Sequence, residues 1–229
     1  DLVRSRGLGD VYKRQVVHED GEVIKQVSQE IYSTGKVTDK SEIGTYWWNE
    51  FQKAFNSAYE DSFETQRKLE YESLKKTIEY FNSTANAKEL SDLMFAHWIK
   101  PPIFEESKQF FEMCPVPIYV VSNIDRDDVL KAIEYHGLKP NGIFTSEDAK
   151  SYKPRKELFQ FALNSTGLSA EQVVHIGDSL SSDIKGASAV GINAIWINRS
   201  KREIPNGVTA VENLLEVYNT CLLYTSPSP

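Results

Sequence analysis

The sequence predicts an α/β fold in which a doubly wound parallel sheet is joined to an α-helical domain. After residue 100, short apolar runs alternate with segments of helical periodicity, which is typical of parallel strands joined by helical crossovers. Successive positions in the runs are apolar, as expected for strands covered on both faces. Before residue 101 the periodicity is helical and no run has the pattern of a strand. A chain of 229 residues can bury a core in each part.

The helical domain is expected to span residues 16–100. Val23, Val27 and Ile31 recur every four residues, and Gly35 is placed to end that helix. Three further stripes at helical spacing follow: Trp48, Phe51, Phe55 and Ala58, then Leu74, Ile78 and Phe81, then Leu90, Leu93, His97 and Trp98. The prolines at positions 101 and 102 interrupt this pattern and indicate a domain boundary. The α/β part is therefore expected to span residues 101–220.

Helices and strands are expected to alternate through the α/β part. Helices are predicted over residues 104–113, 127–136, 155–165 and 182–190, and strands over residues 118–121, 142–145, 173–176 and 194–197. Gly137 is positioned to close the second of these helices. Right-handed crossovers would bring the carboxyl ends of all four strands to one edge of the sheet.

The two ends of the chain do not share the patterns of the elements they would join. The segments are GLGDVYKRQ, from Gly7 to Gln15, and CLLYTSPSP, from Cys221 to Pro229. A single DNA sequence read on its two strands encodes both, and that DNA resembles a transposase adapter used to prepare sequencing libraries. We therefore expect residues 1–15 and 221–229 to be adapter-derived and exclude them from fold prediction. The native protein is expected to begin before Val16 and to end after Thr220.

Composition narrows the classes of partner. The net charge of −7 argues against general binding to nucleic acids or anionic membranes, which requires a basic surface. No apolar run approaches the roughly 18 residues of a membrane span. Cys114 and Cys221 are far apart and lack metal-ligand spacing, so a reducing, cytoplasmic setting is expected. A small-molecule partner is favoured, and the sequence does not indicate an oligomeric state.

Polar residues follow three of the predicted strands. Ser122 and Asn123 end the first strand, Lys153 follows the second, and Asp178 and Asp183 follow the third. Because ligands of open α/β sheets bind outside the carboxyl ends of the strands, these side chains are expected to converge. Hydroxyl, ammonium and carboxylate groups at one place suit a phosphoryl group accompanied by a divalent cation such as Mg²⁺.

Three short segments carry a family resemblance through their order and spacing. VVSN includes Ser122, SYKP includes Lys153 31 residues later, and GDSLSSD includes Asp178 another 25 residues on. Together with IWINR, they resemble the second, third and fourth motifs of the haloacid dehalogenase superfamily of phosphohydrolases, over about residues 103–218. The resemblance implies a Rossmann-like core, with residues 16–100 as its inserted helical cap.

The resemblance also implies a role for each matching residue. Ser122 would hydrogen-bond the transferring phosphoryl group, with Asn123 contributing further hydrogen bonds. Lys153 would neutralise the phosphoryl group and position the nucleophile. Asp178 would hold Mg²⁺. Asp183 would be a second metal ligand, or would orient Lys153 or a metal-bound water instead.

The nucleophile of the resembled family is an aspartate in a DxDx[TV] pattern after the first strand, and it forms an aspartyl phosphate. Residues 16–100 contain no such pattern. Asp125-Arg126-Asp127 follows a strand, but it adjoins Ser122 and Asn123 in the second motif, so we reject it as the nucleophile. The nucleophile is expected upstream of Val16, and this chain, which lacks it, is expected to be inactive.

The leading functional prediction is a magnesium-dependent phosphohydrolase of small phosphorylated metabolites, either sugar phosphates or nucleoside monophosphates. A 2-haloacid dehalogenase of the same fold is the first alternative. A receiver-like signalling domain has similar groups in a different order, with its acids first, and a non-catalytic phosphate-binding module is also an alternative. His175 lies in an apolar run and is expected to be packed rather than catalytic.

Overall fold

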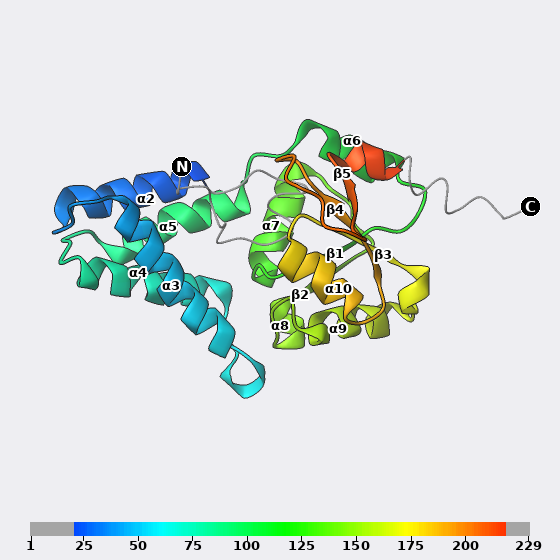
Figure 1. Cartoon of the computed structure of the whole chain (residues 1–229), viewed down its shortest axis with the longest axis horizontal. Coiled ribbons are helices and arrows are strands. Elements are labelled where there is room, and N and C mark those ends of the chain that lie inside the picture. The colour runs from blue at the N-terminus through cyan, green and yellow to red at the C-terminus, as the bar shows by residue number, and fades with distance from the viewer. Residues whose placement is uncertain (1–20, 219–229) are drawn as a thin grey trace, which may run out of the picture.

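The computed structural model describes residues 21–218, and they form a helical part beside an α/β part (Figure 1). The two adapter-like segments lie outside the described residues. The helical part consists of helices α2 (Gly21–Thr34), α3 (Ser41–Ser57), α4 (Gln66–Tyr80) and α5 (Ala87–Ile99), with a short 3₁₀ helix, η1 (Glu60–Ser62). The helical prediction for this region is confirmed over the described residues; the boundary at residue 100 stays a prediction.

The helices of the helical part bury one shared hydrophobic cluster. Val27, Ile31, Leu74 and Trp98 are buried in it, as their spacing predicts. Two details of the predicted stripes are wrong. Met94 is fully buried while Leu93 is 42% exposed, and Trp47 is buried more deeply than Trp48. In both cases neighbouring residues are apolar, so packing against the other helices, rather than the sequence pattern, sets the rotation of the helix.

Local capping groups define where several helices begin and end. Asn86 accepts hydrogen bonds from the amides of Lys88 and Glu89 at 2.9 and 3.3 Å, which satisfies donors at the start of α5. Gly137 ends helix α7 (Arg126–His136) with φ of 68°, a left-handed conformation that glycine adopts without steric cost. The predicted closing role of Gly137 is confirmed.

Within residues 101–218, the α/β part contains five strands and their connecting helices. In chain order its elements are α6 (Glu105–Met113), β1 (Tyr119–Ser122), α7, β2 (Gly142–Thr145), α8 (Ser146–Ala149), α9 (Lys156–Thr166), η2 (Ala170–Gln172), β3 (Val174–Gly177), η3 (Leu180–Lys185), α10 (Gly186–Ser188), β4 (Asn193–Ile197) and β5 (Thr209–Val211). The predicted α/β class is confirmed. The segment from 214 to 218 is again helical.

All strand pairs are parallel, but they form two hydrogen-bonded groups. β1 pairs with β2, with Val120 opposite Ile143, and β3, β4 and β5 form a second group, with Ile176 opposite Ile195. Side chains from both groups enter one hydrophobic cluster, which includes Val120, Ile176 and Ile195. Among the described residues, β1 and β3 therefore each leave one edge without a partner strand inside a shared core.

The segment after β3 differs from the predicted helix over residues 182–190. It forms the π-helical turn η3, in which the amide of Ile184 donates to the carbonyl of Ser179 at 3.1 Å, followed by the short helix α10. The Asp183 carboxylate also accepts a hydrogen bond from the Ser179 amide at 3.0 Å. This local bonding widens the turn and directs Asp183 inward, and π-helical turns are frequent at functional sites.

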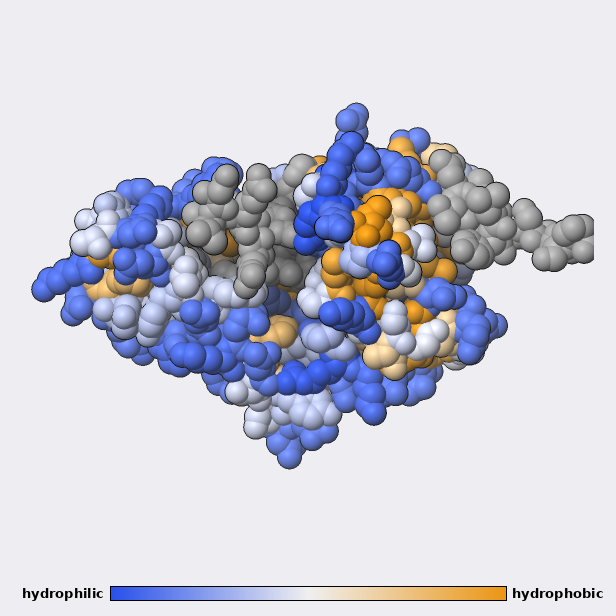
Figure 2. Space-filling model, in the orientation of Figure 1, coloured by the Kyte–Doolittle hydropathy of each residue, from blue (hydrophilic) through white to orange (hydrophobic). Residues whose placement is uncertain are grey.

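The surface differs between the two parts. On the face shown in Figure 2, hydrophobic side chains gather over the α/β part, whereas the helical part is mostly hydrophilic. Individual hydrophobic residues of the α/β part that are more than a third exposed include Phe161, Val174 and Ile204. None of the helices described combines the length and the apolar character that crossing a membrane would need.

Candidate active site

The carboxyl end of β1 supplies two of the predicted site residues. Ser122 is fully buried, and its Oγ accepts a hydrogen bond from the Ile124 amide at 3.1 Å. The Asn123 side chain binds the backbone of Lys153 on both sides: its Oδ1 accepts from the Lys153 amide at 2.8 Å, and its Nδ2 donates to the Lys153 carbonyl at 3.4 Å. Asn123 therefore ties the loop after β1 to the loop that carries Lys153.

The Lys153 ammonium lies between the two groups of strands. Its Nζ donates to the carbonyl of Val121 in β1 at 2.9 Å and lies 3.2 Å from the Oδ1 of Asp183, which follows β3. Neither the Lys153 nor the Asp183 side chain has exposed surface. A buried charge requires a partner, and this ion pair provides one for both residues.

Asp178 and Asp183 follow β3 but lie in different surroundings. Asp178 is 7% exposed, and its backbone carbonyl accepts hydrogen bonds from the indole of Trp196 at 2.7 Å and from Arg202 at 3.3 Å. Asp183 contacts Lys153 and also lies 3.2 Å from the Nε2 of His175. Of the roles expected for Asp183, contact with Lys153 is present in the structure. Ligation of a metal and orientation of a metal-bound water stay predictions.

The charged and hydrogen-bonding groups around Asp183 determine whether its carboxyl group is protonated. Burial opposes ionisation of this carboxyl, but the Lys153 ammonium and the hydrogen bond from His175 outweigh it, so the pKa of Asp183 is held below its usual range. Asp183 is therefore ionised at neutral pH and carries the negative charge that balances Lys153.

The structure joins Asn123, Lys153 and Asp183 through direct contacts. Ser122 precedes Asn123 at the end of β1, and Asp178 and Asp183 both follow β3. His175 packs against Phe159, as expected of a packed residue, but it also contacts Asp183, which was not predicted. The sequence feature that could have indicated this contact is the position of His175 in the strand that precedes Asp178 and Asp183.

Asp125, which follows a strand and superficially matches the nucleophile pattern, serves another purpose. Its side chain is 5% exposed, and its two carboxylate oxygens accept hydrogen bonds from the amides of Gln66 and Arg67 at 2.7 and 2.9 Å. These amides begin helix α4 of the helical part. Both oxygens therefore bind the N-terminus of α4. A helix N-terminus stabilises negative charge, which helps to keep the carboxylate bound there.

The Asp125 carboxyl is expected to make stability depend on pH. Burial raises its pKa to about 6, although hydrogen bonds from Arg67 and Gln66 oppose the effect; the negative charges of Glu147 and Asp128 add to it. The folded protein then binds the Asp125 proton more tightly than the unfolded chain, whose pKa is near 3.8. The free energy of unfolding should fall by up to about 3 kcal/mol as pH rises through this interval, and stay lower above it.

Urea unfolding of the wild-type protein and Asp125→Asn between about pH 4 and about pH 7 measures this contribution. The variant cannot ionise at position 125, so its stability should decline less with rising pH than that of the wild type. Identical pH slopes in the two proteins would contradict the assignment.

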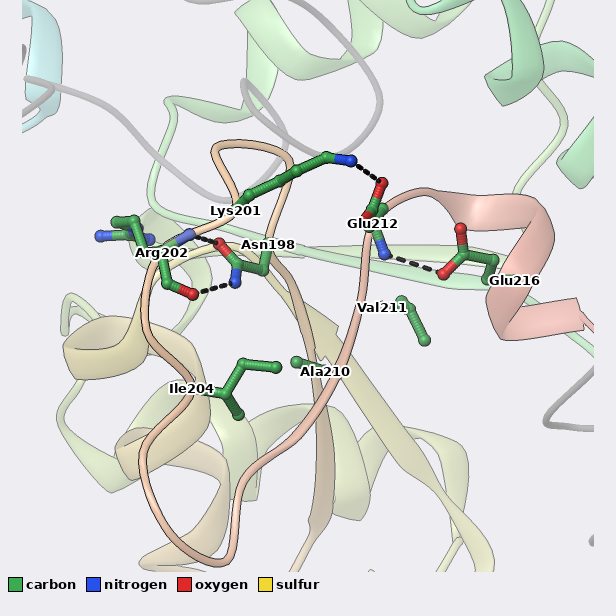
Figure 3. A pocket seen from close by; sticks show the side chains of 8 residues that line it. All are labelled: Asn198, Lys201, Arg202, Ile204, Ala210, Val211, Glu212 and Glu216. Atoms are coloured by element: carbon green, nitrogen blue, oxygen red, sulfur yellow. Dashed lines mark hydrogen bonds and ion pairs between the residues drawn. The ribbon is translucent and has the colours of Figure 1, made fainter.

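A surface cavity of about 380 Å³ lies at the ends of β4 and β5 (Figure 3). Asn198 closes its loop by exchanging hydrogen bonds with the backbone of Arg202 at 2.9 and 2.7 Å, and Lys201 pairs with Glu212 at 3.0 Å. None of the five predicted site residues lines this cavity. Arg202, which lines the cavity, also donates to the Asp178 carbonyl at 3.3 Å.

The side chains at the strand ends include a carboxylate, that of Asp178, that would suit a divalent cation. Mg²⁺ is commonly held by one or two carboxylates, with phosphate oxygens and waters completing its shell. Asp178 lies at the carboxyl edge of β3 and would fit as one such ligand. We find no group of three or more metal-ligating side chains within residues 21–218 that could hold a metal ion by itself. The residue types considered are histidine, cysteine, aspartate and glutamate.

Known proteins resemble this chain in sequence and in fold. YfnB, a HAD-hydrolase of Bacillus subtilis, is 35% identical over 108 residues, which cover 44% of this chain and 46% of YfnB. The pyrimidine 5′-nucleotidase YjjG of Escherichia coli is 36% identical over 64 residues, 28% of each chain. These alignments span about half or less of the length of the curated relatives.

Two solved structures share the fold over most of their length. The structure of YfnB bound to magnesium superposes with a TM-score of 0.70 at 20% identity, covering 90% of this chain and 93% of YfnB. The L-2-haloacid dehalogenase of Xanthobacter autotrophicus with chloropropionic acid covalently bound gives a TM-score of 0.70 at 14% identity, covering 91% and 95%. Residues 20–197 match the haloacid dehalogenase-like hydrolases. Since this match extends over more than half of the sequence, the chain belongs to the haloacid dehalogenase-like hydrolase family.

Proposed function

We propose that this chain is the cap and most of the core of a magnesium-dependent phosphohydrolase of small phosphorylated metabolites. Sugar phosphates and nucleoside monophosphates are the proposed substrate classes, and the cytoplasm is the proposed location. The observation that carries the proposal is the buried Lys153 ammonium, which contacts β1 through Val121 and the loop after β3 through Asp183. A positive charge held between two strand ends suits a phosphoryl group.

Each site residue has a proposed part in the reaction. The Ser122 hydroxyl would donate to a phosphoryl oxygen, while Lys153 would offset the negative charge of the phosphoryl group. Asn123 holds the Lys153 backbone, and Asp183 balances the ammonium and fixes its position. Asp178 would hold Mg²⁺, which when bound would neutralise phosphoryl charge. The similarity to YjjG, a pyrimidine 5′-nucleotidase, supports a phosphorylated substrate.

The nucleophile is proposed to come from a strand outside the described residues. β1 and β3 each have an edge that no described strand occupies, and Lys153 lies between them. A parallel strand there would complete the sheet and bring its carboxyl end beside Lys153. The resemblance assigns that position to a DxDx[TV] motif. Its first aspartate would attack phosphorus and break the P–O bond to the substrate alcohol, which the second aspartate would protonate as it leaves. Water would then hydrolyse the aspartyl phosphate to inorganic phosphate and regenerate the aspartate.

The dehalogenase alternative uses an aspartate that attacks carbon and needs no metal. The likeness to the Xanthobacter dehalogenase, at 14% identity, concerns the fold alone. Asp178 at the strand edge favours the phosphohydrolase, since the dehalogenase reaction requires no metal ligand. Activity that persists in full after chelation with EDTA would favour the alternative instead.

Phosphomonoester hydrolysis by two forms of the protein tests the proposal. This chain should show no magnesium-dependent turnover of p-nitrophenyl phosphate above its Lys153→Ala variant. Extending it with the genomic sequence upstream of Val16 should add a DxDx[TV] strand and restore turnover. Replacing the first aspartate of that motif by asparagine should abolish the restored activity. Turnover by the present chain, or an upstream strand without these aspartates, would refute the proposed arrangement.

A further inference from the structure

Both loops of the candidate site are bound to one stretch of the helical part. This stretch, residues 58–67, connects α3 to α4 and includes η1. The loop after β1 reaches it through Asp125 and Asp128, and the loop before α9 reaches it through Tyr152. We call residues 58–67 the connecting segment.

The first link is a helix cap supplied from the other part of the molecule. Asp125 is the N-cap residue of α7 by its backbone position, yet its side chain makes no capping hydrogen bond to α7. It accepts instead from Gln66 and Arg67, while the Oγ1 of Thr65, the N-cap residue of α4, accepts from the Lys68 amide. The first amides of a helix have no intrahelical partner. The N-terminus of α4 is therefore fully bonded only while the β1 loop is in place.

Arg67 reinforces this link. Its Nε and Nη2 donate to the two carboxylate oxygens of Asp128 at 2.7 and 2.6 Å, and the Asp128 side chain is 1% exposed. A bidentate arginine–carboxylate pair restricts geometry as well as distance. Because Asp128 lies in the first turn of α7, the pair restricts how α4 can rotate relative to α7.

The second link is an aromatic side chain placed in the opposite part. Tyr152 directly precedes Lys153 and is fully buried, but it belongs to the hydrophobic cluster of the helical part. Its ring centroid lies 4.4 Å from that of Phe55 and 5.1 Å from that of Phe63. Its hydroxyl donates to the carbonyl of Glu64 at 2.7 Å. Tyr152 therefore ties the Lys153 loop to the connecting segment through ring packing and this hydrogen bond.

We infer that Asp125 and Tyr152 are positioning residues that couple the placement of the cap to Ser122 and Lys153. Asp125 lies three residues after Ser122, and Tyr152 adjoins Lys153, so one displacement of the connecting segment shifts both phosphate-site loops. The functional meaning of this coupling rests on the proposed phosphohydrolase site. The coupling itself is a property of the described contacts and can be measured without substrate.

Amide hydrogen exchange, followed by NMR on the full chain, tests the coupling. Asp125→Ala should accelerate exchange of the Gln66 and Arg67 amides about ten-fold or more, since it removes their acceptor. It should also accelerate exchange of the Ile124 and Lys153 amides, which donate to Ser122 and Asn123 at 3.1 and 2.8 Å.

Three further variants separate positioning from general stability. Asp125→Asn keeps an acceptor oxygen at a capping position and should restore most of the protection. Tyr152→Phe removes only the hydroxyl and should accelerate exchange at Lys153. Asp127→Ala alters an exposed aspartate in the same helical turn and should leave all four amides unchanged. The amides of β4, from Asn193 to Ile197, serve as an internal reference.

Two results would overturn the inference. One is faster exchange at Gln66 and Arg67 in Asp125→Ala without change at Ile124 and Lys153, which would make Asp125 a cap without coupling. The other is an equal acceleration at the β4 amides, which would indicate general destabilisation. If Asp125→Ala does not fold, unchanged Lys153 exchange in Tyr152→Phe decides against the coupling.

A titration with inorganic phosphate and Mg²⁺ separates this inference from the proposed function. Phosphate should shift the Ser122 and Lys153 amide resonances in the wild-type protein. Absence of any shift would count against the phosphate site, whereas the exchange differences between the variants would still establish the coupling.

Discussion

Replacing Lys153 by methionine is expected to lower the free energy of unfolding by about 3 to 5 kcal/mol, the usual range for removing one partner of a buried ion pair. Methionine fills a similar volume, so cavity formation contributes little. The loss arises because Asp183, fully buried and held ionised largely by Lys153, would keep a charge without its cationic partner. Urea unfolding followed by tryptophan fluorescence measures the change.

The double variant Lys153→Met, Asp183→Asn is the control for this charge effect. Asparagine retains an oxygen that can accept from the Ser179 amide but carries no charge. The double variant should therefore recover most of the stability lost in the single variant, because buried ion pairs can often be replaced together at little cost. Wild-type stability in Lys153→Met alone would show that the pair does not behave as a buried ion pair.

Replacing Gly177 by alanine should be comparably damaging, although only one methyl group is added. A Cβ at this position would lie 2.6 Å from the Cγ of Asp183 and closer still to its Cβ. The methyl group fits only if Asp183 moves, and that movement breaks its contact with Lys153. We therefore expect a loss of about 3 to 5 kcal/mol, above the usual cost of overpacking.

Gly44→Ala provides a matched control for Gly177→Ala. Gly44 lies inside α3, and an added Cβ there meets no atom within 4 Å. This variant should be neutral or more stable by about 0.5 to 1 kcal/mol, as expected for glycine to alanine in a helix interior. In urea unfolding, equal stabilities of the two alanine variants would rule out the predicted conflict with Asp183.

The fold class could be predicted because periodicity is a local property of the sequence. Repeats of three and four residues in the stretch before residue 100, and the alternation of apolar runs and helices after it, depend only on neighbouring positions. The parallel pairing followed from the same alternation. The rotation of individual helices about their axes could not be predicted in this way. Met94 and Leu93 are both apolar, and only contacts with the other helices decide which of them is buried.

The candidate site was predictable in its residues but not in its bonding. By itself, the sequence determined that Ser122, Lys153, Asp178 and Asp183 follow strands, because their order and spacing are encoded directly in the chain. Only the tertiary structure decided that Asp183 faces Lys153 and His175, that Asp125 caps α4, and that Tyr152 packs within the helical part. These contacts join residues 8 to 88 positions apart. Their geometry depends on how separate elements pack, which no local pattern specifies.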